Sequence, residues 1–122
     1  MDKLSYTLES YLDAVYELSL NANSVRLTDI ANRMSVTKST ANAAMVSLAE
    51  KKLVLNERYG DIKLTESGLK TAKLITQKHE ILLNFFTEVL RLDPRTADAD
   101  ACSIEHVISN DTIHAMQAYL KK

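Results

Sequence analysis

Residues 27–50 read LTDIANRMSVTKSTANAAMVSLAE, in which a short segment with apolar residues at helical spacing is followed at once by a longer one. The first segment predicts a short helix capped by Thr28, and Ser35-Val36 predicts a tight turn behind it. The second segment predicts a helix that starts near Thr37. Helical spacing selects the side chains expected to be buried, which are Ile30, Ala31, Met34, Ala41, Ala44, Met45 and Leu48. Two helices joined by so short a turn are typical of a DNA-reading helix-turn-helix, or of an ordinary αα-hairpin.

Small polar side chains gather at the start of the second helix, where a recognition helix must approach base edges and phosphates closely. The residues predicted to contact DNA in this region are Thr28, Thr37, Lys38, Ser39, Thr40 and Asn42. Residues 53–59 then alternate like a β-strand, Gly60-Asp61 supplies a turn, and residues 62–64 form a short return strand. Such a two-stranded wing favours the helix-turn-helix over the hairpin. Three wing residues are expected to contact backbone phosphates: Arg58, Tyr59 and Lys63.

A helix is predicted on each side of this motif. Residues 7–20 place apolar side chains at helical spacing behind a Thr7 N-cap. Thr65 caps a long helix from Glu66 to about Leu92, which carries His79 and is longer than a winged helix-turn-helix requires. The sequence therefore predicts a mainly α protein. A winged helix-turn-helix DNA-binding domain is expected at residues 1–70, followed by a helical metal-binding and dimerisation domain at residues 71–122.

Residues 102–106, Cys-Ser-Ile-Glu-His, place a thiol, a carboxylate and an imidazole three and four positions apart. On a helix from about Asp98 or Asp100 to Ile108, these side chains would share one face. Together they are a metal-ligand set, although a cysteine is often a small buried hydrophobe and a Glu-His pair is often solvated surface. Ser109 predicts the cap of a final helix. Its apolar stripe is expected to pack on a second copy of the chain, together with Phe85 and Phe86; the stripe comprises Ile113, Met116 and Tyr119 or Leu120.

Composition restricts the class of protein further. The chain of 122 residues has two glycines and one proline, which favours helices over a turn-rich β fold. Its net charge is −1, but residues 26–63 hold seven Lys and Arg against four Asp and Glu, which suits contact with phosphate. A single cysteine excludes an intrachain disulfide. Neither a signal peptide nor an apolar run of ~18 residues is present, so we expect a cytoplasmic protein with no membrane contact.

The order of these elements resembles the diphtheria toxin repressor family of metal-activated transcriptional repressors, which has iron-responsive and manganese-responsive branches. The resemblance covers essentially the whole chain. It is carried by residues 12–18, 28–34, 64–68, 78–80 and 102–109, and most specifically by residues 105–109 (Glu-His-Val-Ile-Ser) together with the Lys78-His79 pair. It implies a repressor of metal homeostasis that binds a palindromic DNA operator as a homodimer and depends on Fe2+ or Mn2+. Larger members carry an additional barrel domain, and the resemblance implies the short form without it.

The resemblance also implies a ligand set. The family's metal ligands fall on His79, Cys102, Glu105 and His106, and Asp13 matches the acidic first-helix ligand of the manganese branch. Asp98 stands where the iron branch has an additional histidine. The sequence departs from the family at Ser10, where methionine or aspartate is usual, and at Leu83, which replaces an ancillary carboxylate. Imidazole and carboxylate donors suit both Fe2+ and Mn2+, the thiolate moves the preference toward Fe2+, and other divalent transition metals would bind in vitro.

Two other classes of protein remain open at this point. One is a winged helix transcriptional regulator that uses Cys102 as a thiol-redox switch without a metal, because the neighbouring histidine and glutamate could activate the thiol. The other is an enzyme, such as a metal-assisted hydrolase with Glu105 as the base. The sequence contains no arrangement that resembles a nucleophile, base and orienting group, so we expect no enzymatic activity.

Overall fold

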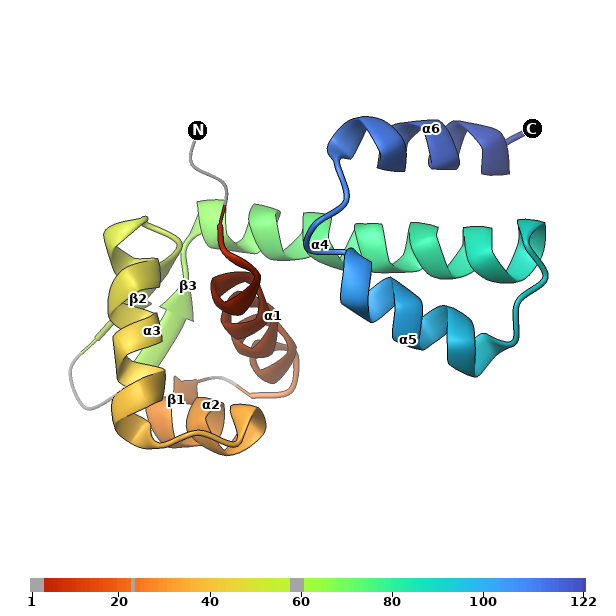
Figure 1. The fold of residues 1–122 in the computed structure, drawn as a ribbon. Helices are drawn as coiled ribbons and strands as arrows, with labels where there is room; N and C mark the ends of the chain where they lie inside the picture. The colour runs from red at the N-terminus through yellow and green to blue at the C-terminus, as the bar shows by residue number, and fades with distance from the viewer. Residues whose placement is uncertain (1–3, 23, 58–60) are drawn as a thin grey trace. The chain divides into compact units, whose positions relative to one another are not determined.

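The computed structural model describes residues 4–22, 24–57 and 61–122, which divide into two compact units, Met1–Lys73 and Leu74–Lys122. The division falls within helix α4 (Glu66–Asn84), near the boundary expected after residue 70. Most of the described residues are helical, as Figure 1 shows, which confirms the predicted mainly α class. Within the described ranges, none of the helices combines the length and apolar character that crossing a membrane requires.

The first unit packs three helices against a small antiparallel sheet. Its helices are α1 (Tyr6–Leu20), α2 (Leu27–Met34) and α3 (Lys38–Glu50), and its strands are β1 (Val25–Arg26), β2 (Val54–Asn56) and β3 (Asp61–Leu64). The strand order is β1-β3-β2, with Val25 opposite Ile62 and Val54 opposite Leu64 (Figure 1). Strands β2 and β3 are the predicted wing. Strand β1 was not expected, because two residues are too few to show an alternating pattern.

The core of the first unit follows the helical spacing of the sequence. Six of the seven side chains predicted to be buried in the helix-turn-helix are buried, and only Met34 is partly exposed. The largest fully buried side chains in this unit come from all three helices and both long strands: Leu12, Val15, Ile30, Met45, Leu48, Val54 and Ile62. Ser35 adopts a left-handed backbone conformation with φ of 57°, which allows the tight turn between α2 and α3.

Two of the predicted helix caps are wrong by two positions each. Helix α1 begins at Tyr6, because the Ser5 hydroxyl, rather than Thr7, accepts from the backbone N–H of Leu8 at 3.2 Å. Thr28 lies inside the first turn of α2, where it cannot cap. The Asp29 carboxylate instead accepts from the backbone N–H of Arg26 at 3.1 Å. In contrast, α3 starts where predicted, directly after Thr37, whose hydroxyl caps the helix by accepting from the Thr40 N–H at 3.1 Å.

The start of α4 is fixed on the segment between α3 and β2. The Thr65 hydroxyl accepts from the backbone N–H of Gly68 at 2.9 Å, which confirms the predicted cap, and it donates to the carbonyl oxygen of Lys52 at 2.7 Å. Gly68 lies so close to the preceding chain that an added Cβ would be 1.9 Å from the carbonyl oxygen of Leu53. Only glycine permits this approach of two backbone segments.

The second unit contains the C-terminal half of α4, the π-helical turn η2 (Phe85–Val89), α5 (Pro94–Ile104) and α6 (Asn110–Leu120). The prediction of one regular helix to Leu92 is therefore wrong after Asn84. There the N–H of Leu90 donates to the carbonyl of Phe85, five residues back, at 3.2 Å. The left-handed backbone of Arg91, with φ of 58°, follows directly. Asp93 and Pro94 then begin α5, as its N-cap and first residue.

Helix α5 also differs from the prediction at its far end. It stops at Ile104, so that Glu105 is its C-cap and His106 lies in the turn that follows, whereas the sequence suggested a helix to Ile108. The N–H of Glu105 still donates to the carbonyl of Ala101 at 3.0 Å, which keeps helical spacing up to that residue. Ser109 caps α6 as predicted, accepting from the Thr112 N–H at 3.2 Å.

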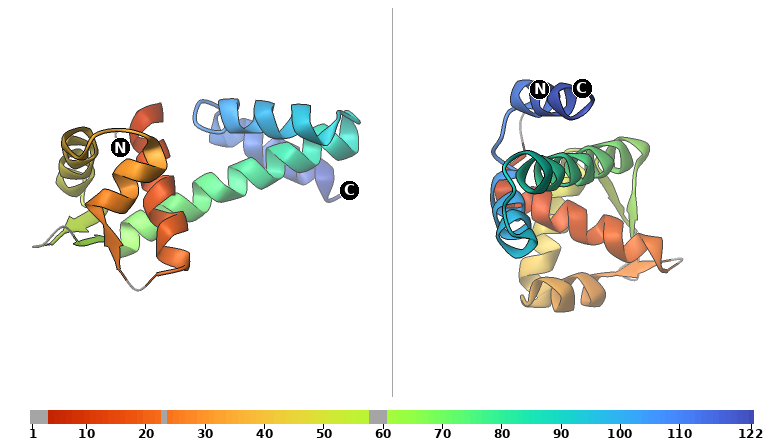
Figure 2. Two further views of the ribbon diagram at one scale, coloured as in Figure 1. Left: turned by 90° about the horizontal axis from the view of Figure 1, so that it is seen from below. Right: turned by 90° about the vertical axis from the view of Figure 1, so that its right-hand side faces the viewer.

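The apolar core of the second unit joins its three helices. Leu82 of α4, Ala101 of α5 and Ile113 of α6 are buried together, and partly buried apolar side chains surround them: Ile81, Phe86, Ile104, Ile108 and Met116. Both α5 and α6 lie along the C-terminal half of α4 (Figure 1 and Figure 2). The expectation that the α6 stripe packs on a second copy is thus wrong for Ile113, which is buried within the chain. Phe86 and Met116 pack in part against the same core, and their contact with a second copy stays a prediction. Tyr119 remains exposed and contacts Phe85 edge-on.

Replacing Gly68 tests the close approach of α4 to the preceding segment. Gly68→Ala gains ~1 kcal/mol of helix propensity. However, its methyl group meets a backbone carbonyl that no side-chain rotation can move, and overpacking of this kind costs about 1 to 3 kcal/mol. We therefore expect a net loss of stability in urea unfolding followed by circular dichroism. Ser67→Ala, at the exposed neighbouring position, serves as the control and should unfold like the wild type.

Candidate metal centre and DNA-binding surface

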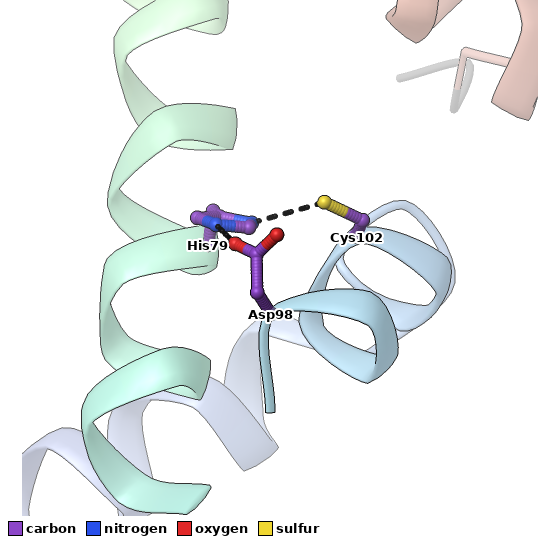
Figure 3. Close-up of side chains that lie close together, drawn as sticks. All are labelled: His79, Asp98 and Cys102. Carbon is purple, nitrogen blue, oxygen red and sulfur yellow. Dashed lines mark hydrogen bonds and ion pairs between the residues drawn. The ribbon is translucent and has the colours of Figure 1, made fainter. Parts of the chain in front are cut away.

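Three potential metal ligands converge on His79, which is itself a potential ligand and lies on α4. Its Nδ1 atom is 2.7 Å from Oε2 of Glu105 and 3.8 Å from Sγ of Cys102. Its Nε2 atom is 3.1 Å from Oδ1 of Asp98. Figure 3 shows Asp98 and Cys102 extending from α5 toward the imidazole ring. The donor atoms of His79, Asp98 and Cys102 all lie within 4.8 Å of one another.

The cluster extends from the surface into the protein. Glu105 and His106 are buried, at 7% and 6% exposure, and Oε1 of Glu105 is 3.2 Å from Nε2 of His106. Glu105 therefore joins the two histidines, with one carboxylate oxygen toward each. Asp98 and Cys102 are exposed and His79 is partly buried. A cation could thus reach the cluster from solvent while contacting donors that are held by the interior.

The local fold explains why these side chains meet. Asp98 and Cys102 are four residues apart on α5 and so project from one face. Ala101, next to Cys102, packs against Leu82, which is three residues beyond His79 on α4. Because the apolar contact fixes which faces of α4 and α5 meet, it also places His79 opposite Asp98 and Cys102.

The donor chemistry fits a divalent transition-metal ion. Imidazole, thiolate and carboxylate are the ligands that such ions prefer, and two donors bound at up to ~2.3 Å lie within ~4.6 Å of each other. The observed cluster needs only small side-chain adjustments to meet that limit. One ring nitrogen of a histidine binds a given ion, and the other commonly donates to a carboxylate. With carboxylates at both of its nitrogens, His79 satisfies both requirements.

Three other positions were discussed in the sequence as possible parts of the metal site: Asp13, Ser10 and Asp98. Asp13 lies on α1, in the first unit, and its assignment as a ligand stays a prediction. The Ser10 hydroxyl donates to the backbone carbonyl of Tyr6, four residues back in the same helix, at 3.1 Å. Asp98 was given no role from the sequence, although its spacing of four from Cys102 was a usable signal.

The predicted DNA contacts lie mainly on the exposed surface of the helix-turn-helix. Side chains exposed there are Thr28, Thr37, Lys38, Ser39, Thr40 and Asn42. The Thr37 hydroxyl is occupied in capping α3, so its DNA contact would come from another of its atoms or from the second lone pair of that oxygen. On β3, Lys63 is exposed and 3.7 Å from Glu57. Arg58 and Tyr59 lie outside the described residues.

Comparison with known proteins agrees with both parts of this picture. Residues 3–62 match the N-terminal DNA-binding domain of the iron-dependent repressors, and residues 65–122 match their metal-binding and dimerisation domain. An uncharacterized HTH-type transcriptional regulator of Methanocaldococcus jannaschii is 30% identical over 120 residues, which cover 98% of this chain and 96% of that protein. The transcriptional regulator MntR of Shouchella clausii is 31% identical over 107 residues, or 88% of this chain and 74% of MntR.

A solved structure extends the comparison to three dimensions. A manganese-dependent transcriptional repressor in complex with manganese superimposes with a TM-score of 0.80 and 26% identity, covering 93% of this chain and 52% of that one. The chain thus spans about half the length of that structure.

Fold, site and relatives together define a winged helix transcriptional regulator that responds to a divalent metal ion. The chain belongs to the iron-dependent repressor family, which confirms the resemblance to the diphtheria toxin repressor family. It is a metal-dependent transcriptional repressor and not an enzyme, and neither the thiol-redox nor the hydrolase alternative is favoured. The two domain matches support DNA and a second copy of the chain as partners, and a divalent metal as cofactor.

Truncating Leu82 tests whether the apolar contact positions the cluster. Leu82→Ala should lower the free energy of unfolding by about 2 to 5 kcal/mol, because a fully buried leucine leaves a cavity. It should also weaken metal binding in a titration of the folded protein, since His79 is on the same helix turn. Leu74→Ala removes an exposed leucine from the same helix and should change neither quantity appreciably. Equal effects of the two substitutions would contradict the positioning role.

Proposed function

We propose that the protein represses genes of metal homeostasis by binding a palindromic operator as a homodimer when Fe2+ or Mn2+ is bound. The observation that carries this proposal is the convergence of Asp98, Cys102 and Glu105 on His79, beside the buried His106. Such a set of donors is best explained by a cation. The solved structure described above, a manganese-dependent repressor in complex with manganese, supports an ion of this kind.

The proposed ligands are Asp13, His79, Cys102, Glu105 and His106. His79 would bind through Nδ1, the nitrogen that faces both Glu105 and Cys102. Asp98 would then accept the proton on Nε2 and so hold the ring in the orientation that coordination needs. The bound ion supplies a double positive charge that draws these anionic donors together.

The choice between Fe2+ and Mn2+ follows from the donors only in part. Carboxylate and imidazole donors suit both ions, whereas the Cys102 thiolate favours Fe2+. Zn2+ binds nitrogen and sulfur donors more tightly than either, so affinity in vitro would not identify the physiological ion. Response of DNA binding to each ion is the more informative property.

Contacts to DNA would come from the first unit. The proposed set is Thr28, Thr37, Lys38, Ser39, Thr40, Asn42, Arg58, Tyr59 and Lys63. Lys38 and Lys63 are exposed and would contact phosphates, which position the protein without reading the sequence. In a dimer, the two α3 helices would enter major grooves about one DNA turn apart, which explains a palindromic operator.

The proposed mechanism is linkage between metal and DNA. An ion that joins Asp13 of the first unit to His79 and Cys102 of the second favours one arrangement of the two DNA-binding units in the dimer. Metal and operator then raise each other's affinity, typically by ~1 to 3 kcal/mol or about 5-fold to 150-fold. The reciprocity is obligatory for equilibrium binding, and so operator DNA must also tighten the binding of the ion.

Histidine substitutions test the linkage. Adding Fe2+ or Mn2+ anaerobically should raise the affinity of the wild type for its operator by about 5-fold to 150-fold, as measured by fluorescence anisotropy. His79→Ala and His106→Ala should abolish that response because each removes a ligand. His114→Ala, an exposed histidine on α6, should respond like the wild type. A metal-independent affinity in the wild type, or a full response in His106→Ala, would disprove the proposal.

Asp98 can be tested separately as an orienting residue. Asp98→Asn retains an oxygen that accepts from Nε2 and should bind Mn2+ nearly as tightly as the wild type. Asp98→Ala removes that acceptor and should lose about 10-fold to 100-fold in affinity. If Asp98 is instead a direct ligand, both substitutions should weaken binding alike. Asp100→Asn, at an exposed acidic position on the same helix, controls for the change in net charge.

A further inference from the structure

We infer that the solvent-facing side of α3 reads A·T base pairs in the major groove, through Asn42, Ala43 and Val46. Each operator half-site would then carry thymines whose methyl groups contact Ala43 and Val46, and an adenine paired with Asn42. This inference rests on the proposed binding of an operator and adds the identity of the bases. It assigns a role in sequence choice to Ala43 and Val46, which the DNA contacts above do not include.

The geometry begins with a single exposed face. Ser39, Asn42, Ala43 and Val46 follow the spacing i, i+3, i+4 and i+7, and all four are exposed. The buried side of α3, formed by Ala41, Ala44, Met45 and Leu48, faces the opposite direction. In the homeodomain, a variant of the helix-turn-helix, the base-contacting positions of the recognition helix show the same i, i+3, i+4, i+7 spacing.

Val46 is the unusual member of this face. Its side chain is 42% exposed on the second helix of the helix-turn-helix, within the residues that match the family's DNA-binding domain, and Ala43 lies one turn before it. A single exposed apolar residue needs no explanation. Here, however, two adjacent apolar side chains lie on the face that would meet DNA. They form a short surface that is complementary to a methyl group and offers no hydrogen bond.

The chemistry of the base edges then selects A·T pairs. Thymine is the base with a methyl group in the major groove, and Asn pairs in bidentate fashion with adenine N6 and N7. Guanine is read most often by Arg or Lys. The sequence of α3 contains one basic residue, Lys38, at the first position of the helix, where it suits a phosphate contact. The exposed face therefore has the partners of A·T pairs and lacks the usual partner of guanine.

Short side chains on this face also permit close approach. Ser39, Asn42, Ala43 and Val46 include no long charged side chain that would hold the helix axis away from the floor of the groove. Methyl contacts need that approach, because apolar side chains contribute only at van der Waals distance. The lack of long side chains is thus a requirement of methyl readout.

The first step of the test identifies the preferred DNA. The metal-loaded full chain is used to select sites from a library of random-sequence duplexes. We expect palindromes whose half-sites contain adjacent A·T pairs at the positions facing α3. Half-sites with G·C pairs at all of these positions would overturn the inference but leave the proposed repressor intact. Failure to enrich any sequence in the presence of metal would overturn both.

The second step removes single methyl groups from the selected duplex. Replacing a contacted thymine by uracil deletes only the C5 methyl group and should weaken wild-type binding by about fourfold. Val46→Ala should weaken binding to the thymine duplex and lose most of its sensitivity to uracil. Leu20→Ala, which shortens an exposed leucine on α1, should keep the full sensitivity. Equal uracil sensitivity of the wild type and Val46→Ala would overturn the contact.

The third step separates base reading from phosphate binding. Asn42→Ala should reduce discrimination at one adenine by about fivefold or more, without a change at other positions. Lys63→Ala should weaken all duplexes alike and lower the salt dependence of binding. If Asn42→Ala also weakens all duplexes equally, Asn42 contacts the backbone and its assignment as an adenine reader is wrong.

Discussion

The contact between His79 and the carboxylates of Asp98 and Glu105 is the interaction on which the second unit depends. One imidazole ring receives a carboxylate at each nitrogen, with a thiol 3.8 Å from one of them. Such a concentration of anionic groups is unfavourable without a compensating charge. The apolar contact of Leu82 with Ala101 holds the two helices together, so the polar groups cannot separate to avoid one another. In the proposed repressor, a divalent cation bound at this cluster would supply the compensating charge.

Hydrophobic spacing predicted much of the fold correctly. The buried face of α3 follows directly from the sequence, because Ala41, Ala44, Met45 and Leu48 are spaced three and four positions apart and so share one side of the helix. Helix ends were less predictable. Ser5 and Thr7 are both residues that favour the N-cap position, so the sequence alone did not decide between them, and Ser5 is the cap. Strand β1 exists only because β3 lies beside it, and no local pattern in two residues records that partner.

The site was predictable in its residue types and less so in its geometry. Spacing predicted that Cys102, Glu105 and His106 share one helix face, but α5 ends at Ile104, so His106 contacts Glu105 from the turn that follows. The role of Asp98 depends on which face of α5 meets α4, and that is a property of packing. The π-helical turn after Asn84 was not predictable either. It spans five residues, which are too few for the spacing of apolar residues to distinguish a π-helix from an α-helix.

The size of the second unit connects its fold to its response. Leu74–Lys122 is shorter than the ~70 residues below which a hydrophobic core rarely supplies more than ~3 to 5 kcal/mol. Five apolar side chains are buried among the described residues of this unit: Ile75, Leu82, Ala97, Ala101 and Ile113. Two of the five are alanines, which bury little surface. A ligand that binds only the folded form adds about 2.7 kcal/mol at a hundredfold excess over its Kd, which is comparable to the whole contribution of such a core. In the proposed repressor, the ion and the second copy would therefore supply much of the stability of this unit. Because His79 and Cys102 are brought together only when the unit is folded, metal binding and folding would be two descriptions of the same equilibrium.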